Sequence, residues 1–111
     1  MAEPLTDTAW VTNLETMVEF ASDGIVSKTV VDEPRTKVVL FAMETGQSLS
    51  EHTASMPASI HVLQGTASLL LGSERHDAPP GTWVYMPAHL NHAVDAVDNV
   101  VFLLTLFRGP E

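Results

Sequence analysis

Histidine is the residue type in this sequence that is best suited to chemistry, because imidazole binds metal ions and exchanges protons near neutral pH. The stretch from Gly46 to Gly65 contains two histidines between two glycines and resembles a metal-binding segment from which some ligands are missing. The chain has no cysteine, which excludes a disulfide framework and thiolate metal or redox chemistry. The histidines are His52, His61, His76, His89 and His92.

The charge of the chain excludes several classes of partner. It carries a formal charge of −9 with five lysine and arginine residues, which is too few to neutralise a run of phosphates. We therefore expect no nucleic acid partner and no binding to a membrane surface. The N-terminus has neither a basic start nor an apolar run, so it is not a secretory signal. Together with the lack of cysteine, this favours a cytoplasmic protein.

Short strands separated by turns are the expected elements that position the histidines. Apolar or alternating runs of four to eight residues with glycine or proline between them predict an all-β sandwich or barrel. No pattern after Phe20 predicts a long helix, which excludes alternating strands and helices. The predicted strands are 25–31, 37–43, those flanking Gly65 (59–64 and 66–71), a polar strand near 73–78, 82–87, 92–97 and 100–107.

The N-terminal region differs from the rest in composition. We expect residues 1–23 to form an arm and residues 24–111 to form a single barrel domain, because 111 residues suit one domain. Within the arm, the apolar spacing from Trp10 to Phe20 is compatible with one or two helical turns, which Asn13 would cap. An extended arm fits the same residues equally well.

Two motifs resemble those of the cupin superfamily. The first cupin motif requires glycine, two histidines, a glutamate and a second glycine at set spacings. Gly46, His52 and Gly65 occupy the first glycine, first histidine and last glycine places. Ala54 occupies the place of the second histidine, and Ala58 occupies the place of the glutamate.

The second cupin motif lies downstream, from Gly81 to Ala96. Gly81, Pro87 and His92 match its glycine, proline and histidine places. His89 stands where the motif has a second glycine, and Ala96 stands where it has an asparagine.

This resemblance, which covers roughly residues 37–107, implies a double-stranded β-helix, a barrel of the jelly-roll kind. It also implies a homodimer, since small single-domain cupins often pair through their N-terminal strands. The apolar strands 100–107 and 25–31 are candidates for a subunit face, and Trp83 with Tyr85 could pack between sheets or at a subunit contact. A structural role through such a dimer, without a pocket function, is one hypothesis for this chain.

The cupin metal site normally has three histidines and one glutamate, and here His52 and His92 remain. The resemblance implies that these two residues would hold one divalent ion, such as Zn, Ni, Fe or Mn. Side chains alternate along a strand, so Glu51 and Asp95 should face away from the two histidines and His61 should point outward. The interior would then lack a carboxylate to offset the ion's charge, which is costly to bury.

A metal-free pocket is the alternative hypothesis. The two histidines would then form a polar pair that binds a small organic ligand or acts as an acid and a base. Three nearby methionines, Met43, Met56 and Met86, could supply soft thioether ligands for Cu(I), or could simply fill gaps in the core. The predicted lining of the pocket is Ile60, Val62, Val84 and Met86.

Overall fold

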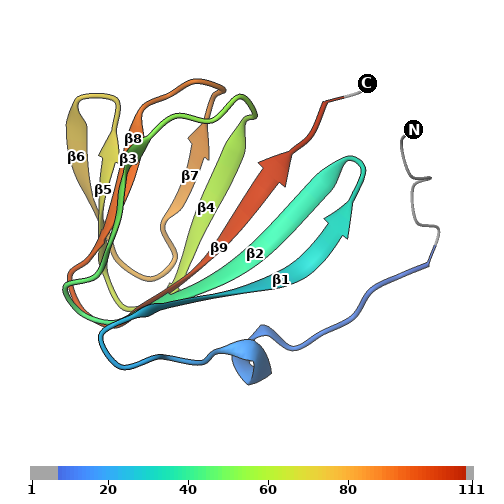
Figure 1. Ribbon diagram of the computed structural model, residues 1–111, viewed down its shortest axis with the longest axis horizontal. Coiled ribbons are helices and arrows are strands. Elements are labelled where there is room, and N and C mark those ends of the chain that lie inside the picture. The colour runs from blue at the N-terminus through green and yellow to red at the C-terminus, as the bar shows by residue number, and fades with distance from the viewer. Residues whose placement is uncertain (1–7, 110–111) are drawn as a thin grey trace.

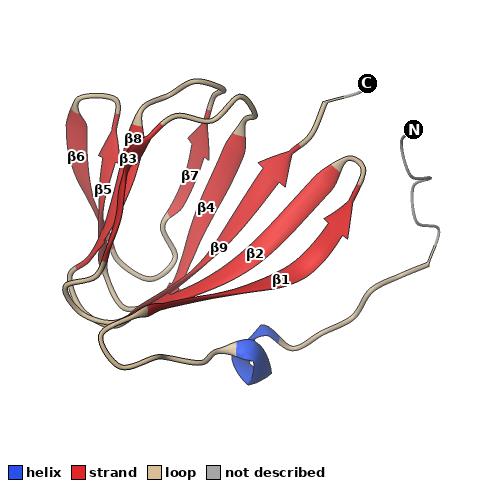
Figure 2. Ribbon diagram, in the orientation of Figure 1, coloured by secondary structure: helices blue, strands red, loops and turns tan. Residues whose placement is uncertain are grey.

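The computed structural model describes residues 8–109, and most of them lie in antiparallel strands (Figures 1 and 2). The predicted all-β jelly-roll barrel is confirmed. One sheet has five strands in the order β1-β2-β9-β4-β7, and the other has four in the order β3-β8-β5-β6. The strands are β1 (Ile25–Glu33), β2 (Thr36–Met43), β3 (Ser48–His52), β4 (Ala58–Gln64), β5 (Ala67–Leu71), β6 (Glu74–Ala78), β7 (Trp83–Met86), β8 (His92–Ala96) and β9 (Val100–Phe107).

The core lies between the two sheets. Alternation along the strands sends one set of side chains inward, and the largest of them are fully buried. The rings of Phe41 and Phe102 stack with their centres 4.9 Å apart. The most deeply buried large side chains between the sheets are Phe102, Met43, Leu69, Met86, Val62 and Val100.

The N-terminal segment crosses the outer face of the five-stranded sheet. Its helical part is a single 3₁₀ turn, η1 (Leu14–Met17), and the side chain of Asn13 caps it by accepting a 2.9 Å hydrogen bond from the Glu15 N–H. Met17, Val18 and Phe20 pack over the outer apolar side chains of β2 and β9. The chain thus combines the two predicted arm conformations, and the boundary between residues 23 and 24 stays a prediction. Residues 1–7 of the predicted arm lie outside the described residues.

The described part of the chain contains no helix of the length and apolar character needed to cross a membrane.

The barrel has two different ends. We call the end that contains Gly65 and Asn99 the closed end, and the end that contains His52 and His92 the mouth. At the closed end Gly65 has φ +69°, and a Cβ added there would lie 2.0 Å from the Asn99 carbonyl oxygen. The Asn99 side chain in turn accepts a 2.9 Å hydrogen bond from the Thr45 N–H. Only glycine fits this crossing, which explains why the sequence has it there.

Candidate ligand site at the barrel mouth

The structure brings His52 and His92 together. They are directly opposite each other in the antiparallel pair of β3 and β8, 40 residues apart in the sequence. Their ring centres are 4.2 Å apart and the rings are tilted by 60°. His92 is half-buried and His52 is exposed, so the pair is accessible from solvent. Their assignment as metal ligands stays a prediction.

Backbone hydrogen bonds determine which nitrogen of each ring is free. His52 Nδ1 lies 2.8 Å from the Ser50 carbonyl oxygen, and His92 Nδ1 lies 2.9 Å from the Leu90 carbonyl oxygen. A carbonyl only accepts, so each Nδ1 carries the proton and donates. In the neutral ring Nε2 therefore keeps its lone pair, and among residues 8–109 neither Nε2 has a hydrogen-bond partner. This arrangement is the one that orients metal-binding histidines.

A register shift in β3 places His52 at the mouth. The pairing of β3 with β8 is irregular between Leu49 and His52. Leu49 packs against the core, and simple alternation would send a residue three positions later to the other face. The register shift reverses this effect of alternation, so Leu49 packs against the core and His52 borders the cavity on the same side of the sheet. Sequence parity alone could not reveal the shift.

A small cavity of about 60 Å³ lies beside the two imidazoles. Ala54 and Ala58, the residues at the two lost ligand places of the cupin motif, both line it. Its volume is that of about two water molecules in the liquid. The lining residues are His52, Ala54, Met56, Ala58, Met86, Pro87, Leu90, His92, Leu104 and Leu106.

The predicted pocket residues occupy two kinds of position. Met86 lines the cavity. Ile60 and Val62 are buried in the core deeper in the barrel, and Val84 packs against that core while partly exposed. None of these three borders the cavity, so their role in ligand binding is still a prediction.

Sequence reasoning did not assign three lining residues: Leu90, Leu104 and Leu106. For Met56 it left two roles open, a soft metal ligand or a side chain that fills the core. Its position within the first motif, two residues from each alanine that replaces a ligand, was a signal that could have placed it at the site. Leu104 and Leu106 alternate along β9, which is consistent with a shared inward face.

The nearby carboxylates lie away from the cavity. The Glu51 side chain accepts a hydrogen bond from the Asn91 side chain and does not line the cavity. Among the described residues no group of three or more histidine, cysteine, aspartate or glutamate side chains gathers to hold a metal. The four-ligand divalent centre of the cupin motif therefore does not fit these residues, whose remaining donors are two imidazoles and two thioethers.

The other histidines are peripheral. His61 is exposed on the outer side of β4, as the alternation predicted, and His76 is exposed on β6. His89 is exposed in the turn before β8 and has φ +69°, a left-handed conformation at the place where the cupin motif has glycine. Its N–H donates a 2.7 Å hydrogen bond to the Ala54 carbonyl, which ties together the two loops at the mouth.

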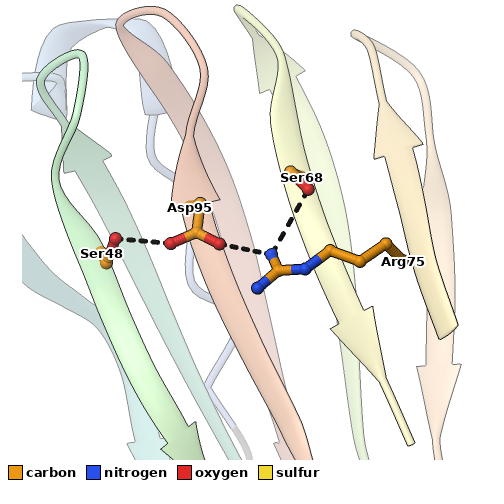
Figure 3. Close-up of polar contacts among 4 residues, drawn as sticks. All are labelled: Ser48, Ser68, Arg75 and Asp95. Carbon is orange, nitrogen blue, oxygen red and sulfur yellow. Dashed lines mark hydrogen bonds and ion pairs between the residues drawn. The ribbon is translucent and has the colours of Figure 1, made fainter. Parts of the chain in front are cut away.

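The outer face of the four-stranded sheet carries a polar network (Figure 3). Asp95 accepts hydrogen bonds from the Ser48 hydroxyl and from Arg75, which also donates a 3.4 Å bond to Ser68. These bonds, the one from Ser48 foremost, lower the pKa of Asp95 below its usual range. Asp95 thus faces away from the cavity, as the alternation predicted, and serves to tie β3, β8, β5 and β6 together.

Two features bear on the predicted subunit face. β9 lies in the middle of the five-stranded sheet, hydrogen-bonded to β2 and β4, whereas β1 forms an edge of that sheet. Trp83 and Tyr85 are exposed on β7, and Tyr85 lies beside Phe107 with ring centres 6.4 Å apart. The homodimer stays a prediction.

A jelly-roll barrel with a histidine pair at its mouth is the architecture of a cupin. The family model described as the ChrR Cupin-like domain matches residues 6–110, so the chain belongs to this cupin family. No curated protein matches it.

Solved structures agree on the fold. A conserved protein of unknown function from Streptococcus pyogenes is 24% identical with a TM-score of 0.83, covering 100% of this chain and 97% of its own. A cupin superfamily protein from Desulfitobacterium hafniense is 21% identical with a TM-score of 0.84, and the match covers 96% of this chain and 100% of that protein's chain. A cupin 2 conserved barrel domain protein from Leptotrichia buccalis is 30% identical with a TM-score of 0.81, covering 87% of this chain and 47% of its own.

Proposed function

We propose that this cupin domain binds a metal ion at the barrel mouth, with His52 and His92 as its nitrogen ligands. The observation that carries the proposal is the pair of neighbouring rings whose Nδ1 atoms both donate to backbone carbonyls. Two nitrogens bound to one ion at about 2.0–2.1 Å lie at most about 4.2 Å apart. Rings with centres 4.2 Å apart can meet this limit with little movement.

The divalent ions suggested by the motif would be held incompletely. Zn, Ni, Fe or Mn at two imidazoles needs further ligands, because a catalytic zinc normally has three from the protein. Water or a small organic ligand would complete the coordination shell, and the exposed side of His52 is the route by which it would arrive. We therefore expect weak divalent binding in the absence of such a ligand.

A metal-free ligand site is the second candidate, and the aliphatic lining favours it. Leu90, Leu104 and Leu106 give the cavity an apolar wall, and the two Nε2 atoms offer only acceptors while the rings are neutral. A ligand with two hydrogen-bond donors and a small apolar body would suit this combination. A cavity of about 60 Å³ must widen to take a molecule larger than two waters.

Metal titration tests the proposal. Calorimetry with Zn²⁺ and Ni²⁺ on the purified chain should show one site, and His52→Ala or His92→Ala should weaken binding at least about tenfold, which is 1.4 kcal/mol. His76→Ala is the matched control, because His76 is an exposed strand histidine that does not line the cavity. Binding that disappears with His76→Ala and ignores the other two substitutions would refute the proposal.

A further inference from the structure

Two methionines border the same cavity as the two histidines. Met56 comes from the loop between β3 and β4, and Met86 ends β7. Four separate segments thus bring two histidines and two methionines to the lining of a space of about 60 Å³. The remaining lining is proline, alanine and leucine, which offer no side-chain ligand.

This donor set has a definite preference among metal ions. Thioether sulfur is a soft ligand that selects Cu(I), whereas hard divalent ions prefer carboxylate, carbonyl and water oxygens. All four donors are neutral, so they leave the full charge of the ion uncompensated. The free energy cost of moving an ion out of water rises with the square of its charge. This cost is therefore about four times smaller for a monovalent ion than for a divalent ion of the same size.

We propose that the mouth cavity is a Cu(I) site, with the Nε2 atoms of His52 and His92 and the Sδ atoms of Met56 and Met86 as ligands. This inference rests on the proposed function, a metal ion at the barrel mouth, and adds the class of the ion. It also accounts for Ala54 and Ala58, whose small side chains leave space beside the imidazoles where the cupin motif has a histidine and a glutamate.

The positions of the other methionines provide controls. Met43 is fully buried in the core and Met17 packs with the arm on the outer face of the sheet, and neither borders the cavity. Met43→Leu matches Met86→Leu, since both side chains are buried. Met17→Leu matches Met56→Leu, since both are half-buried.

The test is an anaerobic Cu(I) titration of the full chain in competition with a chromophoric Cu(I) chelator, followed by X-ray absorption at the copper edge. The wild type should bind one Cu(I) and show both nitrogen and sulfur neighbours. Met56→Leu with Met86→Leu should lower the Cu(I) affinity at least tenfold and remove the sulfur signal. The same double variant should leave Zn²⁺ and Ni²⁺ affinity within about twofold of wild type. Both control variants should bind Cu(I) as wild type does, and circular dichroism should show that all variants are folded.

The possible failures are distinguishable. Cu(I) binding that persists in the double methionine variant with no sulfur signal, but is lost with His52→Ala, would overturn the Cu(I) inference and leave the histidine site intact. If the wild-type chain bound none of the metals tested, both proposals would be overturned. Cu(I) binding that survives His52→Ala and His92→Ala would also overturn the inference, because the copper would then lie elsewhere.

Discussion

The same two strands, β3 and β8, are built differently at their two ends. At the closed end Ser48 and Asp95 are paired across the strands, and Arg75 and Ser68 extend the network (Figure 3). Two backbone hydrogen bonds of 2.9 Å also join Ala96 to Gly46 and Gln47. At the mouth the pairing is irregular, and His52 and His92 meet with their Nε2 atoms unpartnered among the described residues.

This difference shows how one barrel can be both stable and open to a ligand. Hydrogen bonds and tight packing at the closed end hold the strands in register. The mouth can then carry a cavity, which would be costly in the centre of a core. Substitutions at the closed end should therefore act on stability, and substitutions at the mouth should act on binding.

The largest expected effect is on stability at the closed end. Gly65→Ala places a Cβ 2.0 Å from the Asn99 carbonyl oxygen in a residue with φ +69°, and we expect the free energy of unfolding to fall by about 3–5 kcal/mol. Urea unfolding followed by circular dichroism measures it. Gly46→Ala is the control, because Gly46 has φ +87° and no atom within 4 Å of the added Cβ, so about 1–2 kcal/mol of backbone strain should be its whole effect. Equal losses in the two variants would contradict the account of the closed end.

Restoring the lost carboxylate should change the mouth in a metal-dependent way. Ala58→Glu puts a carboxyl group into the lining of the cavity, and we expect the metal-free variant to lose about 2 kcal/mol because that group is buried without a partner. Zn²⁺ should bind at least about tenfold more tightly than to wild type and recover the loss, as calorimetry and thermal unfolding would show. Ala58→Gln should be destabilised to a similar degree and should gain no more stability from Zn²⁺ than wild type does. A variant whose melting temperature ignores Zn²⁺ would argue that position 58 does not face the ion.

A smaller gain is expected from relaxing the turn at the mouth. His89→Gly removes a left-handed strain of about 1–2 kcal/mol and adds about 0.5–1 kcal/mol of backbone entropy to the unfolded chain. Thermal unfolding should show a net stabilisation of about 0.5–1 kcal/mol. His89→Ala keeps the strain and should show no gain, so an equal gain in both variants would rule out the backbone explanation.

The smallest expected effect is the pH dependence of the polar network. Because the pKa of Asp95 is lowered in the folded state, its ionised form stabilises the fold fully above the usual aspartate pKa of about 3.9. This contribution disappears as pH falls through the lower folded-state value. Asp95→Asn should therefore be less stable than wild type near pH 7, by less than about 1 kcal/mol since the pair is partly exposed, and the difference should be smaller near pH 2. A difference that stays constant between these pH values would show that charge is not its cause.

The sequence predicted the fold well because its signals were local. Glycine and proline placed the turns, and the run from Val100 to Phe107 matches β9 at both ends. The positive φ values of Gly46, Gly65 and Gly81 match the glycine places of the two motifs. Pairing of His52 with His92 could be expected from those motifs.

The details of the site were harder to predict because they depend on contacts between distant segments. The register shift between Leu49 and His52 interrupts the alternation of side chains that was used to predict which residues face the interior. Ile60 and Val62 pack in the core below the cavity, whereas Met56 borders the cavity. This difference depends on how far each strand extends toward the mouth. The tautomers of the two histidines depend on the carbonyls two residues earlier in each chain segment, which only the folded backbone brings into range.

The most direct test of the central claim is long-range ¹H–¹⁵N NMR of the histidine rings at neutral pH, before and after adding Cu(I) or Zn²⁺. We expect both His52 and His92 to carry the proton on Nδ1 in the metal-free protein, and both Nε2 resonances to shift together on binding while His61 and His76 do not change. A free Nδ1 lone pair in either ring of the pair, or a metal-induced shift confined to one of them, would contradict the account.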